Sequence, residues 1–150
     1  MPQPPSTGEE TAVFQLAIQN KASEIVRLSQ WLNQTVAPAL KLSEKLTFRL
    51  DLILEEALTN VIDYAFVSDA PQTITVCLNA AAETVSVQVI DEGRPFNPLA
   101  EHEVKLPTSL EDAGKGGLGL HLIRSYTKTC LYQRRDNQNI FTMILDRHQS

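Results

Sequence analysis

The sequence predicts an α+β two-layer sandwich, in which a mixed, mostly antiparallel sheet carries its helices on one face. Along the chain, the hydrophobic periodicity reads strand, two helices, two strands, glycine-rich loop, helix and two strands. The chain has 150 residues, the size of one domain, and its hydrophobic fraction of 43% is enough to fill one core. We therefore expect a flexible leader over residues 1–10 and a single domain over residues 11–150.

The first half of the chain predicts one strand followed by two helices. Residues 12–18 show the alternation of a half-buried strand, and residues 21–40 then change to helical spacing. Pro38 marks the expected end of that first helix, because proline lacks the N–H that a helix interior needs. The second helix is the longest helical pattern in the chain; Ser43 is its expected N-cap and it continues to Ala65.

The second half of the chain predicts two β-hairpins. Residues 73–78 and 84–90 alternate and are separated by a short polar segment. Residues 130–135 and 140–145 do the same around a turn over residues 136–139. Each pair is expected to form an antiparallel ladder.

The segment between the hairpins predicts a functional loop. Residues 92–117 hold four of the six glycines, three prolines and many charges. Loops of this length in compact domains are usually lids or binding loops. We expect a mobile lid over residues 98–113 and a short amphipathic helix over residues 118–127.

Charge and composition exclude several classes of function. The chain carries 13 Lys and Arg against 18 Asp and Glu, a formal charge of −5, and no basic cluster. Phosphate-backbone binding needs clustered positive charge, so no direct nucleic-acid partner is expected. The sequence shows no secretory signal and no apolar run of bilayer length, so we expect a cytoplasmic protein without a membrane partner. Cys77 and Cys130 are far apart and predict neither a zinc site nor a disulfide.

Polar residues recur at one-turn spacing on the second helix. Glu56, Asn60 and Tyr64 form a row beside the apolar stripe, whereas Glu55 and Thr59 fall on the far side. One interpretation is the polar margin of an amphipathic helix. The other is chemical, because a carboxylate and an amide carbonyl one turn apart supply a proton acceptor and hard oxygen ligands to a magnesium-bound phosphate chain. The helix alone leaves both open.

Two glycine-containing segments can likewise be interpreted either as structural turns or as parts of a binding site. Asp91 follows an alternating strand with Gly93 two residues later, which predicts either a surface turn or a carboxylate that accepts a hydrogen bond from the exocyclic amine of adenine. Residues 114–120 run into the last helix, where glycine N–H groups and the helix N-terminus favour an anion. The segment matches neither a P-loop nor a dinucleotide fingerprint. A flexible hinge is the alternative.

Together the three segments resemble a known set of motifs. E-A-L-T-N at residues 56–60, D-E-G-R-P-F-N-P at 91–98 and G-G-L-G-L at 116–120 resemble the N, G1 and G2 boxes of the ATPase superfamily that includes gyrase B, Hsp90, histidine kinases and MutL. Within it, they look most like the small bacterial anti-sigma factor serine kinases of partner-switching systems. The resemblance covers about residues 11–145 and implies the histidine kinase-like ATPase fold.

The resemblance implies ATP and Mg²⁺ as cofactors and a role for each motif residue. Glu56 would be the catalytic base and Asn60 would help to hold Mg²⁺ against the phosphates. Asp91 would bind the adenine amine in a pocket shaped by Gly93. The rest of the implied nucleotide-binding set comprises Lys115, Gly116, Gly117, Leu118 and Gly119. Two departures from the family stand out: Tyr64 occupies the usual place of a histidine, and Pro95 replaces the second glycine of the G1 box, a change that the serine-kinase branch tolerates.

The implied function is an ATP-dependent protein serine/threonine kinase that acts as an anti-sigma factor and phosphorylates a small antagonist (anti-anti-sigma) protein. A sigma factor and a second copy of the chain remain open as further partners. The alternatives are a non-catalytic, nucleotide-gated protein-binding module and an isolated histidine kinase-type catalytic domain. A complete histidine kinase is excluded, because none of His102, His121 and His148 lies on a long helix ahead of the nucleotide motifs. His121 is expected on a helix surface.

Overall fold

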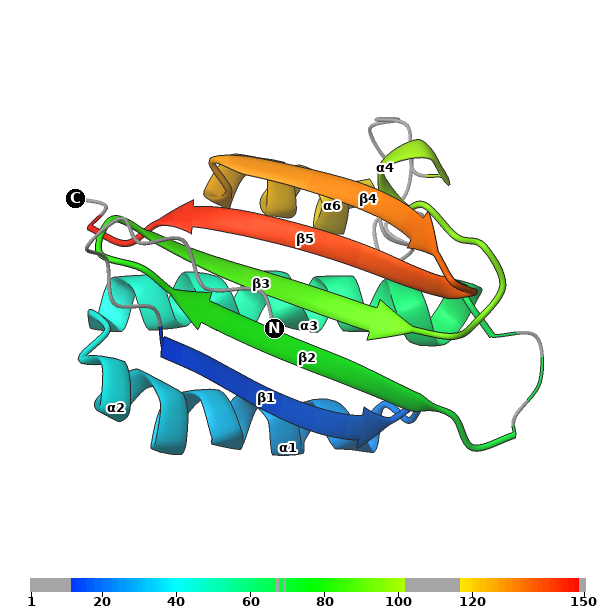
Figure 1. Ribbon diagram of the computed structural model, residues 1–150, viewed down its shortest axis with the longest axis horizontal. Helices are drawn as coiled ribbons and strands as arrows, with labels where there is room; N and C mark the ends of the chain where they lie inside the picture. The colour runs from blue at the N-terminus through cyan, green and yellow to red at the C-terminus, as the bar shows by residue number, and fades with distance from the viewer. Residues whose placement is uncertain (1–11, 67, 69, 102–116, 149–150) are drawn as a thin grey trace, which may run out of the picture.

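The computed structural model describes residues 12–66, 68, 70–101 and 117–148, which form a five-stranded sheet with its helices on one face (Figure 1). The strand order is β1-β2-β3-β5-β4. The strands are β1 (Ala12–Gln19), β2 (Thr73–Ala80), β3 (Thr84–Asp91), β4 (Thr129–Arg135) and β5 (Gln138–Asp146). The predicted α+β sandwich is confirmed.

All four strand pairings are antiparallel, so the mixed sheet that the sequence predicted is corrected for these five strands. The physical reason is visible in Figure 1, where each long element reverses the direction of the one before it. Among the described elements, two long helical segments separate β1 from β2, and the short turn at Pro98–Glu101, the helix Gly117–Tyr126 and β4 separate β3 from β5. Three reversals between paired strands leave them antiparallel.

The first helical segment is one rod with a π-turn inside it. It consists of α1 (Ser23–Trp31), the π-turn η1 (Leu32–Val36) and α2 (Ala37–Leu40). The rod passes through Pro38 and ends at Leu40, so the prediction of an end at Pro38 was early by two residues. Lys41, the C-cap, has a left-handed φ of 55°. The N–H of Ala37 donates to the carbonyl of Leu32, five residues back. Pro38 thus lies in the first turn of α2, directly after the π-turn, where a proline is tolerated because it has no N–H to leave unpaired.

The remaining helices are α3 (Glu44–Tyr64), the single turn α4 (Pro98–Glu101) and α6 (Gly117–Tyr126). Ser43 caps α3 as predicted, because its Oγ accepts a hydrogen bond of 3.0 Å from the Leu46 N–H. The turn α4 begins the segment that the sequence predicted to be a lid. The rest of that segment, from residue 102 on, lies outside the described residues, as does the predicted leader over residues 1–10.

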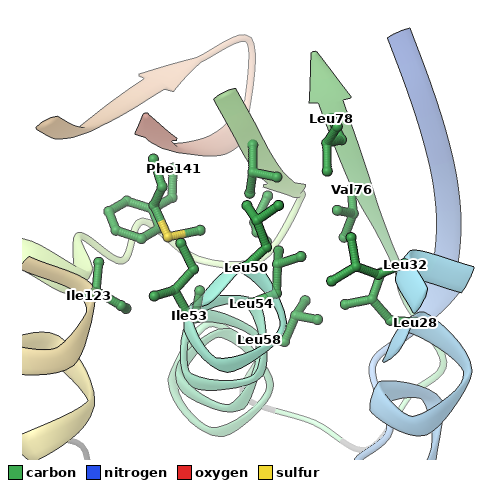
Figure 2. Close-up of a cluster of buried hydrophobic side chains, with 14 of the residues drawn as sticks. Leu28, Leu32, Leu50, Ile53, Leu54, Leu58, Val76, Leu78, Ile123 and Phe141 are labelled. Carbon is green, nitrogen blue, oxygen red and sulfur yellow. The ribbon is translucent and has the colours of Figure 1, made fainter. Parts of the chain in front are cut away.

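The hydrophobic core lies between the sheet and α3, with α1 and α6 on either side (Figure 2). The stripe predicted on the second helix is the centre of this core, and Leu50, Leu54 and Leu58 point to the sheet. Val76, Leu78 and Phe141 meet them from the strands. Because this stripe is tightly packed against the sheet, α3 cannot easily rotate or shift. The polar row beside the stripe therefore keeps a fixed position relative to the sheet.

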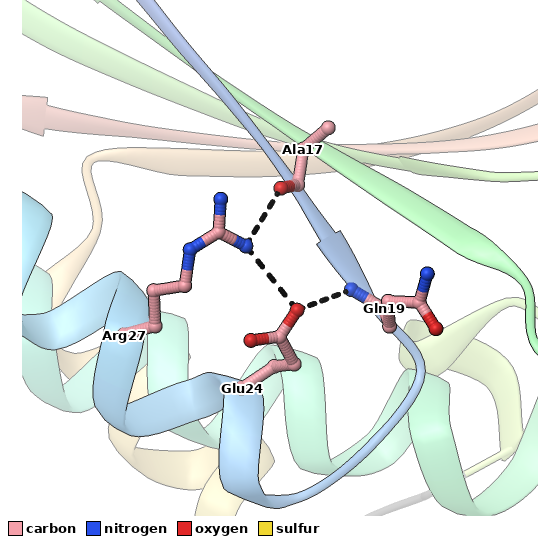
Figure 3. Close-up of polar contacts among 4 residues, drawn as sticks. All are labelled: Ala17, Gln19, Glu24 and Arg27. Atoms are coloured by element: carbon pink, nitrogen blue, oxygen red, sulfur yellow. Dashed lines mark hydrogen bonds and ion pairs between the residues drawn. The ribbon is translucent and has the colours of Figure 1, made fainter.

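Polar contacts tie the edge strand β1 to α1 (Figure 3). The carboxylate of Glu24 accepts hydrogen bonds from the Gln19 N–H (3.0 Å) and from Arg27 (3.2 Å). Arg27 also donates to the carbonyl of Ala17 at 3.2 Å. The Arg27 side chain is 53% exposed, so this ion pair adds little stability.

Cys77 and Cys130 are both half-buried free thiols. In the part of the chain that is described, none of the helices combines the length and the apolar character needed to span a bilayer.

Candidate functional site

The polar row of α3 lies where the helix meets its neighbours. Asn60 is only 3% exposed and Glu56 is half-buried, whereas Glu55 and Thr59 face solvent. The helical geometry predicted from the spacing is therefore present. Asn60 lies deeper than the margin of an amphipathic helix, because α3 is covered on this side as well as by the sheet.

Asn60 has an unsatisfied amide. Its Nδ2 is buried and has no hydrogen-bond partner among the residues that the structure describes. Leaving a buried polar group unpaired costs about 1–3 kcal/mol, so such a group in a native fold calls for a ligand or a functional reason. A side-chain amide can turn either its nitrogen or its oxygen to an incoming group.

Glu56 lies against the start of α6. A Cβ built on Gly119 would overlap Oε2 of Glu56, so the absence of a side chain at Gly119 lets the Glu56 carboxylate lie directly against α6. Burial raises the pKa of the Glu56 carboxyl, and the negative charge of Glu55 raises it further. A carboxylate with a raised pKa at the N-terminal turn of a helix is suited to accept a proton.

Asp91 is the last residue of β3, as the sequence predicted, and its side chain is 2% exposed. Its Oδ1 accepts hydrogen bonds from the Gly93 N–H (2.8 Å) and from Asn139 Nδ2 (2.9 Å). Burial raises the pKa of Asp91, and the two hydrogen bonds together with the charge of Arg134 partly oppose that rise. The two hydrogen bonds and Arg134, in contrast to burial, favour the ionised form of Asp91, which accepts hydrogen bonds only.

The segment after Asp91 is fastened to the C-terminal end of α3. The Arg94 N–H donates to the carbonyl of Ala65 (2.8 Å), and Arg94 Nε donates to the carbonyl of Tyr64 (2.7 Å). The rings of Tyr64 and Phe96 are stacked, with centroids 5.6 Å apart. Tyr64, which stands in the place of the expected histidine, thus supports the loop that follows β3. Pro95, in the middle of this loop, is exposed.

We expect Gly93→Ala to destabilise the fold by about 1–3 kcal/mol, because its Cβ would overlap the backbone carbonyl of Ala65. Gly119→Ala is the matched comparison. Its Cβ would meet the movable end of the Glu56 side chain, and alanine is favoured over glycine within a helix. Urea unfolding should show a clear loss for Gly93→Ala only. Equal stability of the two variants would contradict the close packing inferred here.

Sequence reasoning missed a buried polar cluster around Asn139. Asn139 was expected in a turn over residues 136–139, but the turn is formed by Asp136 and Asn137, both with positive φ. Asn139 is instead the second residue of β5 and lies directly opposite Asp91. Asp and Asn are among the residues that tolerate the positive φ of a two-residue hairpin turn. A turn placed at Asp136 and Asn137 would have put Asn139 inside the strand, on its core-facing side.

The other predicted site residues are placed only in part. Gly117 is the first residue of α6, one position before the predicted start, and Leu118 follows it. Lys115 and Gly116 lie outside the described residues. His121 is exposed on α6, in agreement with the prediction.

The site residues follow one another along α3. Gly119 meets the helix at Glu56, and Gly93 meets it at Ala65, nine residues later, which is roughly 13 Å along the helix axis. Asn60 lies between these two points. A proton acceptor, an unpaired amide and a buried carboxylate are thus arranged in the order in which a nucleotide would present its terminal phosphate, its phosphate chain and its base.

A family model for the histidine kinase-like ATPase domain matches residues 18–145. The chain belongs to this family. The match spans nearly every described element, from the end of β1 to β5. The resemblance based on the three motifs is confirmed at this level, and the domain is kinase-like and uses ATP.

Two individual proteins illustrate the relationship. The histidine kinase-like ATPase domain described here is 37% identical, over 101 residues, to the serine/threonine-protein kinase BtrW of Bordetella bronchiseptica, covering 67% of this chain and 71% of that protein. Its fold is similar to that of the histidine kinase AdeS of Acinetobacter baumannii, with a TM-score of 0.50 and 14% identity, covering 89% of this chain and 68% of that one. The second likeness concerns the fold alone.

Proposed function

We propose that this domain is an ATP-dependent protein serine/threonine kinase that acts as an anti-sigma regulatory factor and phosphorylates a small antagonist protein. The observation that carries the proposal is the order along α3, with Glu56 under α6, Asn60 in the middle and Asp91 beyond the helix end. The serine/threonine kinase name of the relative from Bordetella bronchiseptica supports the activity, and the three motifs support the anti-sigma role.

In this proposal Asp91 accepts a hydrogen bond from the exocyclic amine of adenine, and the N–H groups at the start of α6 bind the phosphates. The hydroxyl of the substrate serine or threonine attacks the γ-phosphorus. A bond forms between that oxygen and phosphorus, the bond to the bridging oxygen breaks, and ADP leaves. Glu56 takes the hydroxyl proton. Positioning and charge neutralisation are the main requirements for such a transfer.

Asn60 fits a role in holding magnesium. No cluster of three or more His, Cys, Asp or Glu side chains occurs within the described ranges, so the fold offers no ready-made cage of ligands. Magnesium typically takes few ligands from protein and the rest from phosphates and water, so one amide oxygen can suffice. The unpaired Nδ2 of Asn60 has no hydrogen bond to lose if the amide turns to present its oxygen, the atom that Mg²⁺ binds. When bound, Mg²⁺ would neutralise phosphate charge. Asn60→Ala is accordingly expected to raise the Mg²⁺ concentration needed for half-maximal activity.

The proposal is tested by incubating the protein with γ-labelled ATP and the proteins encoded by the genes beside its own. We expect acid-stable label on a serine or threonine of one small protein. Acid-labile label on a histidine would favour the histidine kinase alternative. Nucleotide-dependent binding of a partner without any transfer would favour the binding module.

The pH dependence of transfer should report the ionisation of Glu56. Its pKa is raised, and a base must be ionised, so activity is expected to fall as the pH drops through this raised value. Because Glu55 contributes to the rise, Glu55→Gln should move the acid limb to lower pH. Glu83→Gln removes the same charge from an exposed residue just before β3, at the end of that strand opposite Asp91, and should leave the limb in place. Identical profiles for both variants would contradict the assignment of this limb to Glu56.

A further inference from the structure

We propose that Asn139 is a positioning residue for nucleotide recognition, which holds the Asp91 carboxylate in the orientation that selects adenine. The proposal rests on the proposed function, because it assumes that Asp91 binds the base. It concerns a different residue, on a different strand, and it has its own test.

The first argument is that the Asn139 side chain uses all of its hydrogen-bonding capacity. Its Nδ2 donates to Asp91 Oδ1 (2.9 Å) and to the carbonyl of Arg94 (2.8 Å). Its Oδ1 accepts from the Phe96 N–H (3.1 Å) and from the Tyr132 hydroxyl (2.5 Å). Two donors and two acceptor sites are the full inventory of an amide, and all four are used at 3% exposure.

The second argument is that the surroundings fix which end of the amide faces Asp91. The Phe96 N–H and the Tyr132 hydroxyl both donate to the oxygen of Asn139, so its NH₂ group must turn to Asp91 and Arg94. A carboxylate at this position could donate to neither, and an aliphatic side chain would remove one hydrogen bond from each of four polar groups. The position thus requires an amide in one orientation.

The third argument concerns the consequence for Asp91. Both of its described hydrogen bonds, from Gly93 and from Asn139, end on Oδ1. Oδ2 is therefore the oxygen that the carboxylate offers to an exocyclic amine. An ionised carboxylate can only accept hydrogen bonds. It therefore binds the amine of adenine, which donates one, and disfavours guanine, which presents a carbonyl at that position. Asn139 fixes the rotation of the carboxylate and, through its donated hydrogen bond, helps to keep it ionised.

The test compares Asn139→Asp with Asn137→Asp. Both substitutions are isosteric and add one negative charge to the same hairpin, but Asn137 is exposed in the turn. Asn139→Asp replaces the NH₂ donor by a second acceptor facing Asp91. Calorimetry at pH 8 is expected to show ATP affinity reduced at least tenfold for Asn139→Asp, with circular dichroism unchanged, and within twofold of the wild type for Asn137→Asp.

A pH series separates positioning from a structural role. Two facing carboxyls share a proton as the pH falls, which restores a donor between them. The difference in ATP affinity between Asn139→Asp and Asn137→Asp should therefore narrow at lower pH, with Arg134 of β4 as the charged neighbour of Asp91 in every variant. A difference that stays constant with pH would overturn the positioning role.

A second variant covers the case in which Asn139→Asp does not fold, and two further results would overturn the proposed function itself. If Asn139→Asp does not fold, Tyr132→Phe takes its place: it removes one hydrogen bond to the Asn139 oxygen and keeps the ring, and we expect a two- to fivefold weaker affinity for ATP. Unchanged affinity for the variant that is measured would overturn the inference. If the wild type does not bind ATP, or if Asp91→Asn binds ATP as well as the wild type, the proposed function itself fails.

Discussion

Glu56→Gln is expected to retain ATP binding and to slow phosphoryl transfer by a factor on the order of 10² or more. Glutamine has nearly the same shape as glutamate, so the close approach of Gly119 to this side chain is preserved. What the variant loses is the ability to take the proton from the attacking hydroxyl. Single-turnover transfer to the antagonist protein measures the rate, and calorimetry measures the affinity for ATP.

The control for this experiment is Glu83→Gln, which should transfer at the wild-type rate at pH 8. A Glu56→Gln protein with unimpaired transfer would remove Glu56 from the mechanism and would favour the binding-module alternative. Loss of transfer together with loss of ATP binding would instead assign Glu56 to the nucleotide site.

Asp91→Asn is expected to weaken ATP binding by roughly 10- to 150-fold, which corresponds to the 1.5–3 kcal/mol of a charge-assisted hydrogen bond. The carboxylate is buried and accepts two hydrogen bonds in the described structure, so asparagine fits the space but does not carry the charge. Asp136→Asn, in the exposed turn between β4 and β5, is the matched control and should not change the affinity. Equal affinities of the wild-type protein for ATP and GTP would contradict the adenine role of Asp91.

The parts of the site that lie on regular elements could be predicted from the sequence. Glu56 and Asn60 are four residues apart, and every α-helix has about 3.6 residues per turn, so the spacing alone places both on the same side of α3. Asp91 could be placed at a strand end, because alternation stops there and Gly93 follows. The family match confirms the motif resemblance that these positions support.

The contacts between elements could not be predicted in the same way. The approach of Gly119 to Glu56 depends on how closely α6 packs on α3, and no local pattern encodes that distance. Asn139 was missed because the turn before it is two residues long, and a strand pattern that starts two residues late hides the position opposite Asp91. The direction of the strands also required the whole topology, since it follows from the number of elements between paired strands.

The fastening of the segment after β3 to the end of α3 has a thermodynamic consequence. Arg94 donates hydrogen bonds to the carbonyls of Ala65 and Tyr64, and Asn139 donates one to the Asp91 carboxylate. These hydrogen bonds are present in the structure without a nucleotide. The conformational entropy of the Asp91 side chain is therefore lost when the chain folds and not when it binds a base. In the proposed function, adenine would therefore bind a carboxylate that is already ordered, and less of the favourable enthalpy of the new hydrogen bond would be offset by lost entropy.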